Sequence, residues 1–211
     1  MDRPLSFVLT GALALAACSQ EPATTDDAPE GREATPPTTP ATPPEAPAPE
    51  ASEPAGGPGS RYTRFDLSAC EILREEREEG SFADYRCPGL AGLPLLVQEG
   101  DGRFDLDAGV DDDAFQTIGA FNDIGPTVEW RLRDGRPFAV IFRFLDRAMM
   151  DPGRTVLAVE TVGSEGTPGC RVAQIAGNTP EANARARELA DTRAAAFRCG
   201  RDETIYLGEA R

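Results

Sequence analysis

The chain has 211 residues, of which 36 are acidic and 21 are basic, and it contains no histidine, so its net charge is −15. Without histidine there is no Ser-His or Cys-His nucleophilic pair, no histidine general base and no histidine-ligated zinc or iron. The excess of acids argues against a nucleic-acid partner, because phosphate binding needs a basic surface.

The N-terminus has the pattern of an export signal. Residues 5–16 form an apolar run of twelve (LSFVLTGALALA). The run is shorter than the about 20 residues that a membrane-spanning helix needs, and its length is typical of the apolar part of a secretory signal. We therefore expect residues 1–17 to be a signal peptide.

The end of this run resembles the lipobox of bacterial lipoproteins. It reads Leu15-Ala16-Ala17-Cys18, with small residues before the cysteine. The resemblance implies that Cys18 is lipidated, that the signal is cut just before it, and that the acyl chains hold the protein on a membrane. Because Ser19 rather than aspartate follows, it also implies the outer membrane, facing the periplasm. The alternative is an ordinary signal peptide in which Cys18 is incidental.

Residues 18–60 are predicted to be the lipid anchor followed by a disordered tether. The segment 21–60 contains 11 prolines among Ala, Thr and Glu, and residues 19–60 contain no aromatic or large aliphatic residue. Such a segment cannot bury enough apolar surface to offset the cost of ordering. The alternative function for it is a proline-rich ligand of a recognition domain.

Residues 61–211 are long enough to bury a core of their own and are predicted to form the globular periplasmic domain. The alternation of apolar and polar residues predicts mostly strands, and Asp-Gly pairs at 101–102 and 134–135 indicate tight turns. The expected strands are 62–68, 94–98, 103–107, 127–133, 137–145, 155–162, 170–175 and 203–207.

One helix is well signalled near the C-terminus. Thr179 is the expected N-cap, Pro180 the first helical residue, and the helix should end near Phe197. Arg187 and Asp191 have the spacing of an ion pair. A second, shorter helix is predicted over 112–122. These elements predict an α+β fold, a mostly antiparallel β-sheet with one C-terminal helix packed on it.

Four cysteines remain once Cys18 is assigned to the lipid, and an even number in an oxidising compartment indicates disulfides. They are Cys70, Cys87, Cys170 and Cys199. Four cysteines allow three pairings. We favour the two that close the short loops, Cys70 with Cys87 and Cys170 with Cys199. A four-thiolate metal site is disfavoured because no Cys-x-x-Cys pair is present.

An acidic stretch over 99–113 is the first candidate for chemistry, but its order does not match a calcium-binding EF-hand loop. On a strand, Arg103, Asp105 and Asp107 would share one face, which we interpret as solvated. The sequence therefore identifies no catalytic, cofactor-binding or metal-ligating residue.

The hairpin over 129–136 is the clearest candidate surface. Arg131 and Arg133 are expected on one exposed face, and Arg136 follows the turn. Guanidinium groups suit the carboxylates and phosphates of envelope polymers, so these three arginines form a possible anion-binding site. The alternative is that they pair with nearby acids.

The segment Tyr85-Arg-Cys87, followed by an apolar strand, resembles the start of bacterial C-type lysozyme-inhibitor lipoproteins, which are small anchored antiparallel-sheet domains. Their Ser-Gly-x-x-Tyr-like inhibitory signature is absent here. We therefore predict a lipid-anchored envelope protein whose domain binds an envelope polymer or a protein without catalysis. The alternatives are an inhibitor of a basic enzyme such as lysozyme, toward which the negative charge would steer it, and a small carboxylate-dependent hydrolase.

Overall fold

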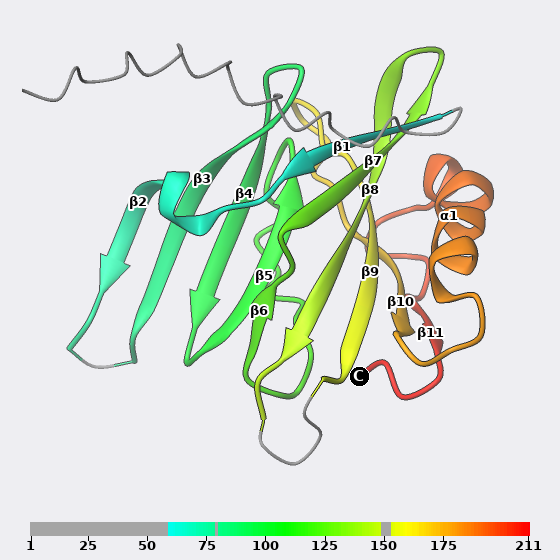
Figure 1. Ribbon diagram of the computed structural model, residues 1–211. Helices are drawn as coiled ribbons and strands as arrows, with labels where there is room; N and C mark the ends of the chain where they lie inside the picture. Colours follow the sequence, from blue (N-terminus) through cyan, green and yellow to red (C-terminus); the bar gives the residue numbers. More distant parts are fainter. Residues whose placement is uncertain (1–58, 79, 149–152) are drawn as a thin grey trace, which may run out of the picture. The chain divides into compact units, whose positions relative to one another are not determined.

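Two β-sheets and one helix make up the fold of the computed structural model, which describes residues 59–78, 80–148 and 153–211 (Figure 1). The larger sheet has the strand order β1-β7-β8-β9-β10-β11, with β6 paired to the end of β8. The smaller sheet has the order β2-β3-β4-β5. The strands are β1 (Ser60–Arg64), β2 (Glu71–Glu76), β3 (Phe82–Leu90), β4 (Leu93–Gly100), β5 (Arg103–Ala108), β6 (Asn122–Ile124), β7 (Thr127–Arg133), β8 (Arg136–Asp146), β9 (Thr155–Thr161), β10 (Arg171–Ala176) and β11 (Ile205–Leu207).

The main hydrophobic core lies between the two sheets. The smaller sheet contributes Leu95, Val97 and Leu106, and the larger one contributes Trp130 and Phe142, among others. Each of these side chains is at most 1% exposed. Val128 and Trp130 of β7 both point into this core, as expected for the apolar residues of a strand in which apolar and polar residues alternate.

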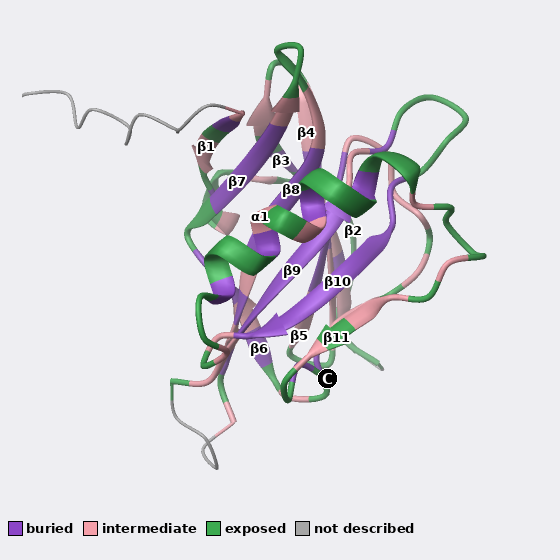
Figure 2. Cartoon of the chain, turned by 90° about the vertical axis from the view of Figure 1, so that its right-hand side faces the viewer, coloured by how far each residue is buried: buried purple, intermediate pink, exposed green. Residues whose placement is uncertain are grey.

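The helix α1 (Ala182–Arg193) covers the other face of the larger sheet and continues into a short 3-10 helix (Ala194–Ala196). Figure 2 shows α1 lying across the buried strands β8, β9 and β10. Its contact face consists of alanines four residues apart, which lie on one side of a helix and allow its backbone to approach the sheet closely. The buried members are Ala182, Ala186, Ala190 and Ala194.

The predicted fold class is confirmed, because nearly all strand pairs are antiparallel and α1 packs on the sheet. One connection differs. The strands β10 and β11 are parallel neighbours, and α1 joins them, as a parallel pair requires. The domain thus contains one strand-helix-strand unit that the sequence did not indicate.

Both helix predictions need correction. Thr179 does not cap α1: its carbonyl accepts a hydrogen bond from the Ala182 backbone, and the helix begins only after Glu181, which has a left-handed φ of 56°. No helix forms over 112–122. There the side chains of Asp111 and Asp112 accept hydrogen bonds from the backbone two residues on, a local arrangement that competes with helix.

The smaller sheet is larger than predicted. The sequence predicts no strand before residue 94 in this sheet, but Glu71–Glu76 is a strand paired with β3. All six of its residues are exposed. An edge strand without a buried side has no period-two apolar pattern, and so sequence periodicity does not detect it.

The predicted disulfides are confirmed. Cys70 is bonded to Cys87, and Cys170 to Cys199. The first joins the start of β2 to its partner strand β3. The second joins β10 to the segment that follows the short 3-10 helix. Within the described ranges, no helix has the length and apolar character needed to cross a membrane.

Candidate functional site

The arginine hairpin is only partly a surface feature. Arg131 is 9% exposed, because α1 covers this face of β7. Its guanidinium donates to both carboxylate oxygens of Asp191, at 2.9 and 2.7 Å, and also to Ser60. The expectation of an exposed Arg131 is therefore wrong, whereas Arg133 and Arg136 are exposed. The pairing of Arg131 with Asp191 agrees with the alternative that the arginines pair with nearby acids. Binding of anions by the hairpin stays a prediction.

Glu129 forms the second part of this interface between sheet and helix. It accepts hydrogen bonds from Ser60 at 2.7 Å and from Arg187 at 2.8 Å. Burial alone would raise the pKa of Glu129, but these hydrogen bonds hold it below its usual value. Arg187 and Asp191 therefore do not pair with each other as predicted. Arg187 pairs with Glu129 and Asp191 pairs with Arg131, so both ion pairs join the helix to the sheet. This network has a structural use in fixing α1.

The more unusual group lies at β5. Asp105 and Asp107 are 2% and 3% exposed, so the interpretation of this strand face as solvated is wrong. Leu106 and Ala108 point into the core between the sheets. The alternate side of β5 is covered as well, because the following segment folds back and the backbone N–H of Gln116 donates to Asp105.

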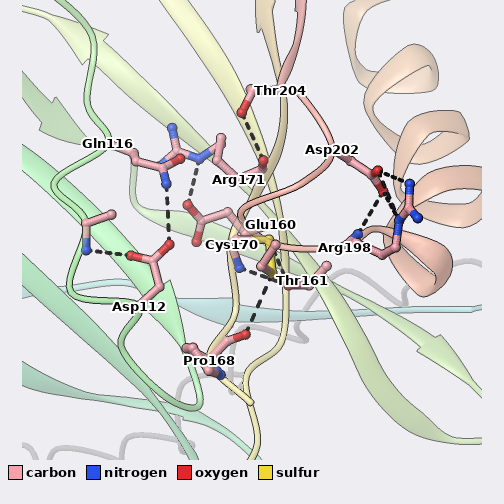
Figure 3. Close-up of a disulfide and its surroundings, with 12 residues drawn as sticks. Asp112, Gln116, Glu160, Thr161, Pro168, Cys170, Arg171, Arg198, Asp202 and Thr204 are labelled. Atoms are coloured by element: carbon pink, nitrogen blue, oxygen red, sulfur yellow. Dashed lines mark hydrogen bonds and ion pairs between the residues drawn. A yellow bond between two sulfur atoms is a disulfide. The ribbon is translucent and has the colours of Figure 1, made fainter.

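Arg171 on β10 is the centre of this buried group. It donates from Nε to Glu160 on β9 at 2.6 Å (Figure 3) and from Nη2 to Asp105 at 2.7 Å. Its side chain is 1% exposed, and its guanidinium lies 5.4 Å from the ring centroids of both Phe142 and Phe144. Burial alone would lower the pKa of Arg171, but Glu160 and Asp105 raise it, so the cation is retained.

Three glycines explain how the end of β5 reaches these strands. An added Cβ on Gly109 would lie 2.2 Å from the Gly163 carbonyl oxygen. A Cβ on Gly163 would lie 2.7 Å from the Gly169 nitrogen. The backbones can therefore approach only without side chains, and Gly163 donates to the Ala108 carbonyl at 2.7 Å. These contacts hold the segment that follows β5 directly against the segment that follows β9.

The buried charges of this group do not balance. Three carboxyl groups, on Asp105, Asp107 and Glu160, face one guanidinium. Oε2 of Glu160 is buried and has no hydrogen-bond partner among the described residues. Burial raises the pKa of Glu160 to about 8, and burial together with the charges of Glu160 and Asp105 raises the pKa of Asp107 to about 10. In the folded state, both acids therefore favour the protonated form more strongly than exposed carboxyl groups do.

Two further acids adjoin it. Carboxylate oxygens of Asp107, Asp111 and Asp112 lie within 4.8 Å of one another. Gln116 donates through its side chain to Asp112 at 3.3 Å. Figure 3 shows the Glu160 carboxylate lying between Arg171 and Asp112. We call Asp107, Asp111, Asp112 and Glu160 the acid cluster. Its members are oxygen ligands, the type that hard divalent cations bind.

An open groove of about 590 Å³ runs beside this group. It combines two partly exposed aromatic rings with amide, hydroxyl and guanidinium groups. Its lining residues are Arg103, Phe115, Gln116, Thr117, Ile118, Gly119, Arg171, Gln174, Thr204 and Tyr206. Phe115 and Tyr206 are 44% and 40% exposed. The volume falls within the range of about 300–1,000 Å³ that is typical of ligand sites.

The groove and the acid cluster are neighbours, but the residues that line the groove are not the acids of the cluster. Arg171 lines the groove, while none of the four acids of the cluster does so. Gln116 belongs to both, because it lines the groove and is held by Asp105 and Asp112. The segment after the cluster therefore forms one side of the groove.

Cys18, the predicted lipidation site, lies outside the described residues, as do the predicted signal peptide and nearly all of the predicted tether. The chain matches no protein-family model, and no curated protein or solved structure shows significant similarity to it.

Sequence reasoning did not find the groove or the acid cluster. Asp105 and Asp107 were assigned to the correct strand, but the alternation of β5 does not reveal what covers its polar side. Arg171 carried no signal beyond its place in a short strand. The spacing of Gly109, Gly163 and Gly169 marks the close approach only once the strands are known to be neighbours.

Proposed function

We propose that this protein is a lipid-anchored component of the bacterial cell envelope whose domain binds an envelope glycan in the groove between the 115–119 segment and the strands β10 and β11. The anchor rests on the resemblance to the lipobox that ends at Cys18, followed by the proline-rich tether. An exported domain on a tether would be in reach of the carbohydrate polymers of the envelope.

The groove is the observation that carries the binding function. Phe115 and Tyr206 offer partly exposed aromatic rings to the apolar side of a sugar, and the Arg211 guanidinium lies over one face of the Tyr206 ring, 4.3 Å from its centroid. Gln116, Thr117 and Thr204 offer amide and hydroxyl groups for the sugar hydroxyls. A few polar groups among apolar ones are the usual composition of a ligand site.

Arg103 adds a feature suited to an acidic sugar. Its Nη2 donates to Asp101 at 2.9 Å, while its Nε is buried and has no hydrogen-bond partner among the described residues. Peptidoglycan carries carboxylates that a guanidinium group recognises, so it is the glycan we favour.

A small carboxylate-dependent hydrolase is the second candidate, because Glu160 and Asp107 have strongly raised pKa values, a property of catalytic acids. Their side chains, however, are nearly inaccessible and do not line the groove. A catalytic acid must come within hydrogen-bond reach of its substrate. Binding therefore fits this geometry better than catalysis.

A binding experiment tests the groove. Purified protein is incubated with insoluble peptidoglycan, and the bound fraction is measured for Phe115→Ala and Tyr206→Ala. We expect each variant to bind about tenfold more weakly, which corresponds to the loss of about 1.4 kcal/mol. The matched control is Phe121→Ala, because Phe121 is 56% exposed but does not line the groove. Equal binding by all three variants and the wild type would reject the groove, and release of glycan fragments by the wild type would reject the non-enzymatic function.

Fractionation tests the anchor. The Cys18→Ser variant should leave the membrane fraction and appear in soluble material, since no lipid can be attached. A variant that fractionates with membranes as the wild type does would show that Cys18 does not carry the anchor.

A further inference from the structure

The acid cluster has features of a cation site that its role in folding does not explain. Buried ionised groups are normally paired, since removing a charge from water is costly. Here Arg171 satisfies Asp105 and one oxygen of Glu160. Four acids face Asp107, namely Glu160, Asp105, Asp112 and Asp111, and the nearby cation Arg171 gives its hydrogen bonds to Glu160 and Asp105 instead.

The geometry points to a single divalent-cation site, best suited to Ca²⁺, that is formed by Asp107, Asp111 and Asp112 and lies beside the buried carboxylate of Glu160. Calcium binds carboxylate oxygens at about 2.3–2.6 Å, so two ligand oxygens of one ion lie up to roughly 5 Å apart. The oxygens of the three aspartates lie within 4.8 Å of one another.

The Glu160 carboxylate is an observation independent of that clustering. Its side chain is 3% exposed, and its Oε2 is left without a partner where a well-packed interior would supply one. Figure 3 shows this carboxylate facing Asp112 on the side away from Arg171. A divalent cation held by the three aspartates would place a positive charge next to this carboxylate and would neutralise two of the excess negative charges.

The chemistry of the ligands selects the class of metal. All three ligand side chains are carboxylates, so the hard cations Ca²⁺ and Mg²⁺ are favoured over metals that prefer nitrogen or sulfur. Magnesium demands a tighter octahedron at about 2.0–2.1 Å, whereas calcium accepts irregular sets and completes its shell with water or carbonyl oxygens. Asp111 and Asp112 are partly exposed and leave room for such waters.

Occupation of this site would affect the groove as well. Asp112 holds the Gln116 side chain, and Gln116 lines the groove. The cation would therefore restrict the 111–119 segment, which is one wall of the proposed glycan site. This consequence rests on the proposed function, but the cation site itself does not.

Calorimetric titration of the purified full chain with CaCl₂, after treatment with a chelator, tests the site directly. We expect one Ca²⁺ per chain and a dissociation constant on the order of 10⁻⁴–10⁻³ M, as in extracellular calcium modules. Mg²⁺ should bind at least about tenfold more weakly. At a Ca²⁺ concentration ten times the dissociation constant, the unfolding temperature should rise by about 3–6 °C.

Two variants and one control make the test specific. Asp107→Asn and Asp111→Asn should each weaken Ca²⁺ binding by at least about tenfold and reduce the thermal shift at the same Ca²⁺ concentration to about 1–2 °C or less. Asp107→Asn should still fold, because it removes a buried acid that accepts no hydrogen bond from Arg171 in the described part of the chain. Asp113→Asn is the control: Asp113 belongs to the same acidic run but is exposed and outside the cluster, and its φ of 60° suits asparagine.

The outcomes are decisive. No heat of binding and no thermal shift at about 5 mM Ca²⁺ would overturn the site, since this exceeds the expected range of dissociation constants. Loss of binding in Asp113→Asn equal to that in Asp111→Asn would also overturn it, because it would indicate general attraction to acidic surface. Ca²⁺ binding without any effect on peptidoglycan would keep the site and would contradict its link to the groove.

Discussion

Replacing Arg171 by methionine tests whether the buried charges hold β5 against the larger sheet. The substitution keeps an unbranched apolar stem next to Phe142 and Phe144 but removes the cation that both Asp105 and Glu160 contact. The two acids would then be buried without a positive partner. Breaking a buried ion pair by removing one member costs about 3–5 kcal/mol, and here one residue serves two pairs. We expect a loss in the free energy of unfolding at the upper end of that range.

The measurement is urea denaturation with the disulfides intact, followed by the fluorescence of Trp130. This residue is the only tryptophan of the chain and is fully buried, so its emission reports on the core between the sheets. Arg198→Met is the matched control. Arg198 pairs with Asp202 at a similar distance of 2.7 Å, but its side chain is 67% exposed. Exposed pairs contribute little, so the control should unfold almost as the wild type does.

A loss as large as 5 kcal/mol can unfold a domain, since total stabilities are about 5–15 kcal/mol. The triple variant Arg171→Met/Asp105→Asn/Glu160→Gln keeps the experiment informative in that case. It removes the unpaired charges together with the cation, so it should regain at least half of the lost free energy. If Arg171→Met costs less than about 1 kcal/mol, or no more than Arg198→Met, the reasoning is wrong.

Three further predictions concern the disulfides, the hairpin and pH. Replacing either cysteine pair by serine should lower the free energy of unfolding, measured by urea denaturation, by about 2–4 kcal/mol. Loss of Cys170–Cys199 should cost about 0.5 kcal/mol more than loss of Cys70–Cys87, because it closes a loop of 29 rather than 17 residues. The reverse order would contradict this dependence on loop length. The double variant Arg133→Glu/Arg136→Glu should reduce retention on peptidoglycan at low salt and leave it unchanged at about 0.5 M salt, since exposed charges are screened, and unchanged retention at low salt would reject the hairpin. In the presence of a chelator, the free energy of unfolding should fall as the pH rises from about 6 to 10. The pKa values of Glu160 and Asp107 are raised to about 8 and about 10, so the folded state binds more protons than the unfolded state. Asp107→Asn should reduce this pH dependence, and a pH dependence equal to that of the wild type would show that Asp107 titrates normally.

The sequence predicted most of the larger sheet because its strands have one buried side and a strong apolar pattern. β7 and β8 were located within one residue of their ends, and the turn between them follows from Asp134-Gly135. The pairing of the cysteines was also correct, since the shortest loops were the ones formed. Local signals failed where tertiary contacts decide. Thr179 has the residue type of an N-cap, but the chain turns through Glu181 before α1 begins.

The polar side chains were the hardest to predict, because alternation assigns a residue to a side of a strand without saying what covers that side. Arg131 was expected on the surface and is covered by α1, and Asp105 is covered by the segment around Gln116. In both cases the covering element is far from the strand in sequence or lacks regular structure. The burial of Arg131 and Asp105 can be inferred only when the positions of their partners, Asp191 and Arg171, are known.

The two buried charge groups differ in a way that separates structure from function. At the helix, Glu129 and Arg131 are matched by Arg187, Asp191 and Ser60, so that network is complete and fixes α1. Around Arg171 the acids exceed the cations, and one carboxylate oxygen remains without a partner. A buried ion pair is weak support for stability, because apolar residues of similar volume often serve as well. An excess of acid is costly to the cation-free fold, and it becomes favourable once a divalent cation supplies the missing charge. The imbalance, rather than the burial itself, is therefore the feature that indicates a ligand.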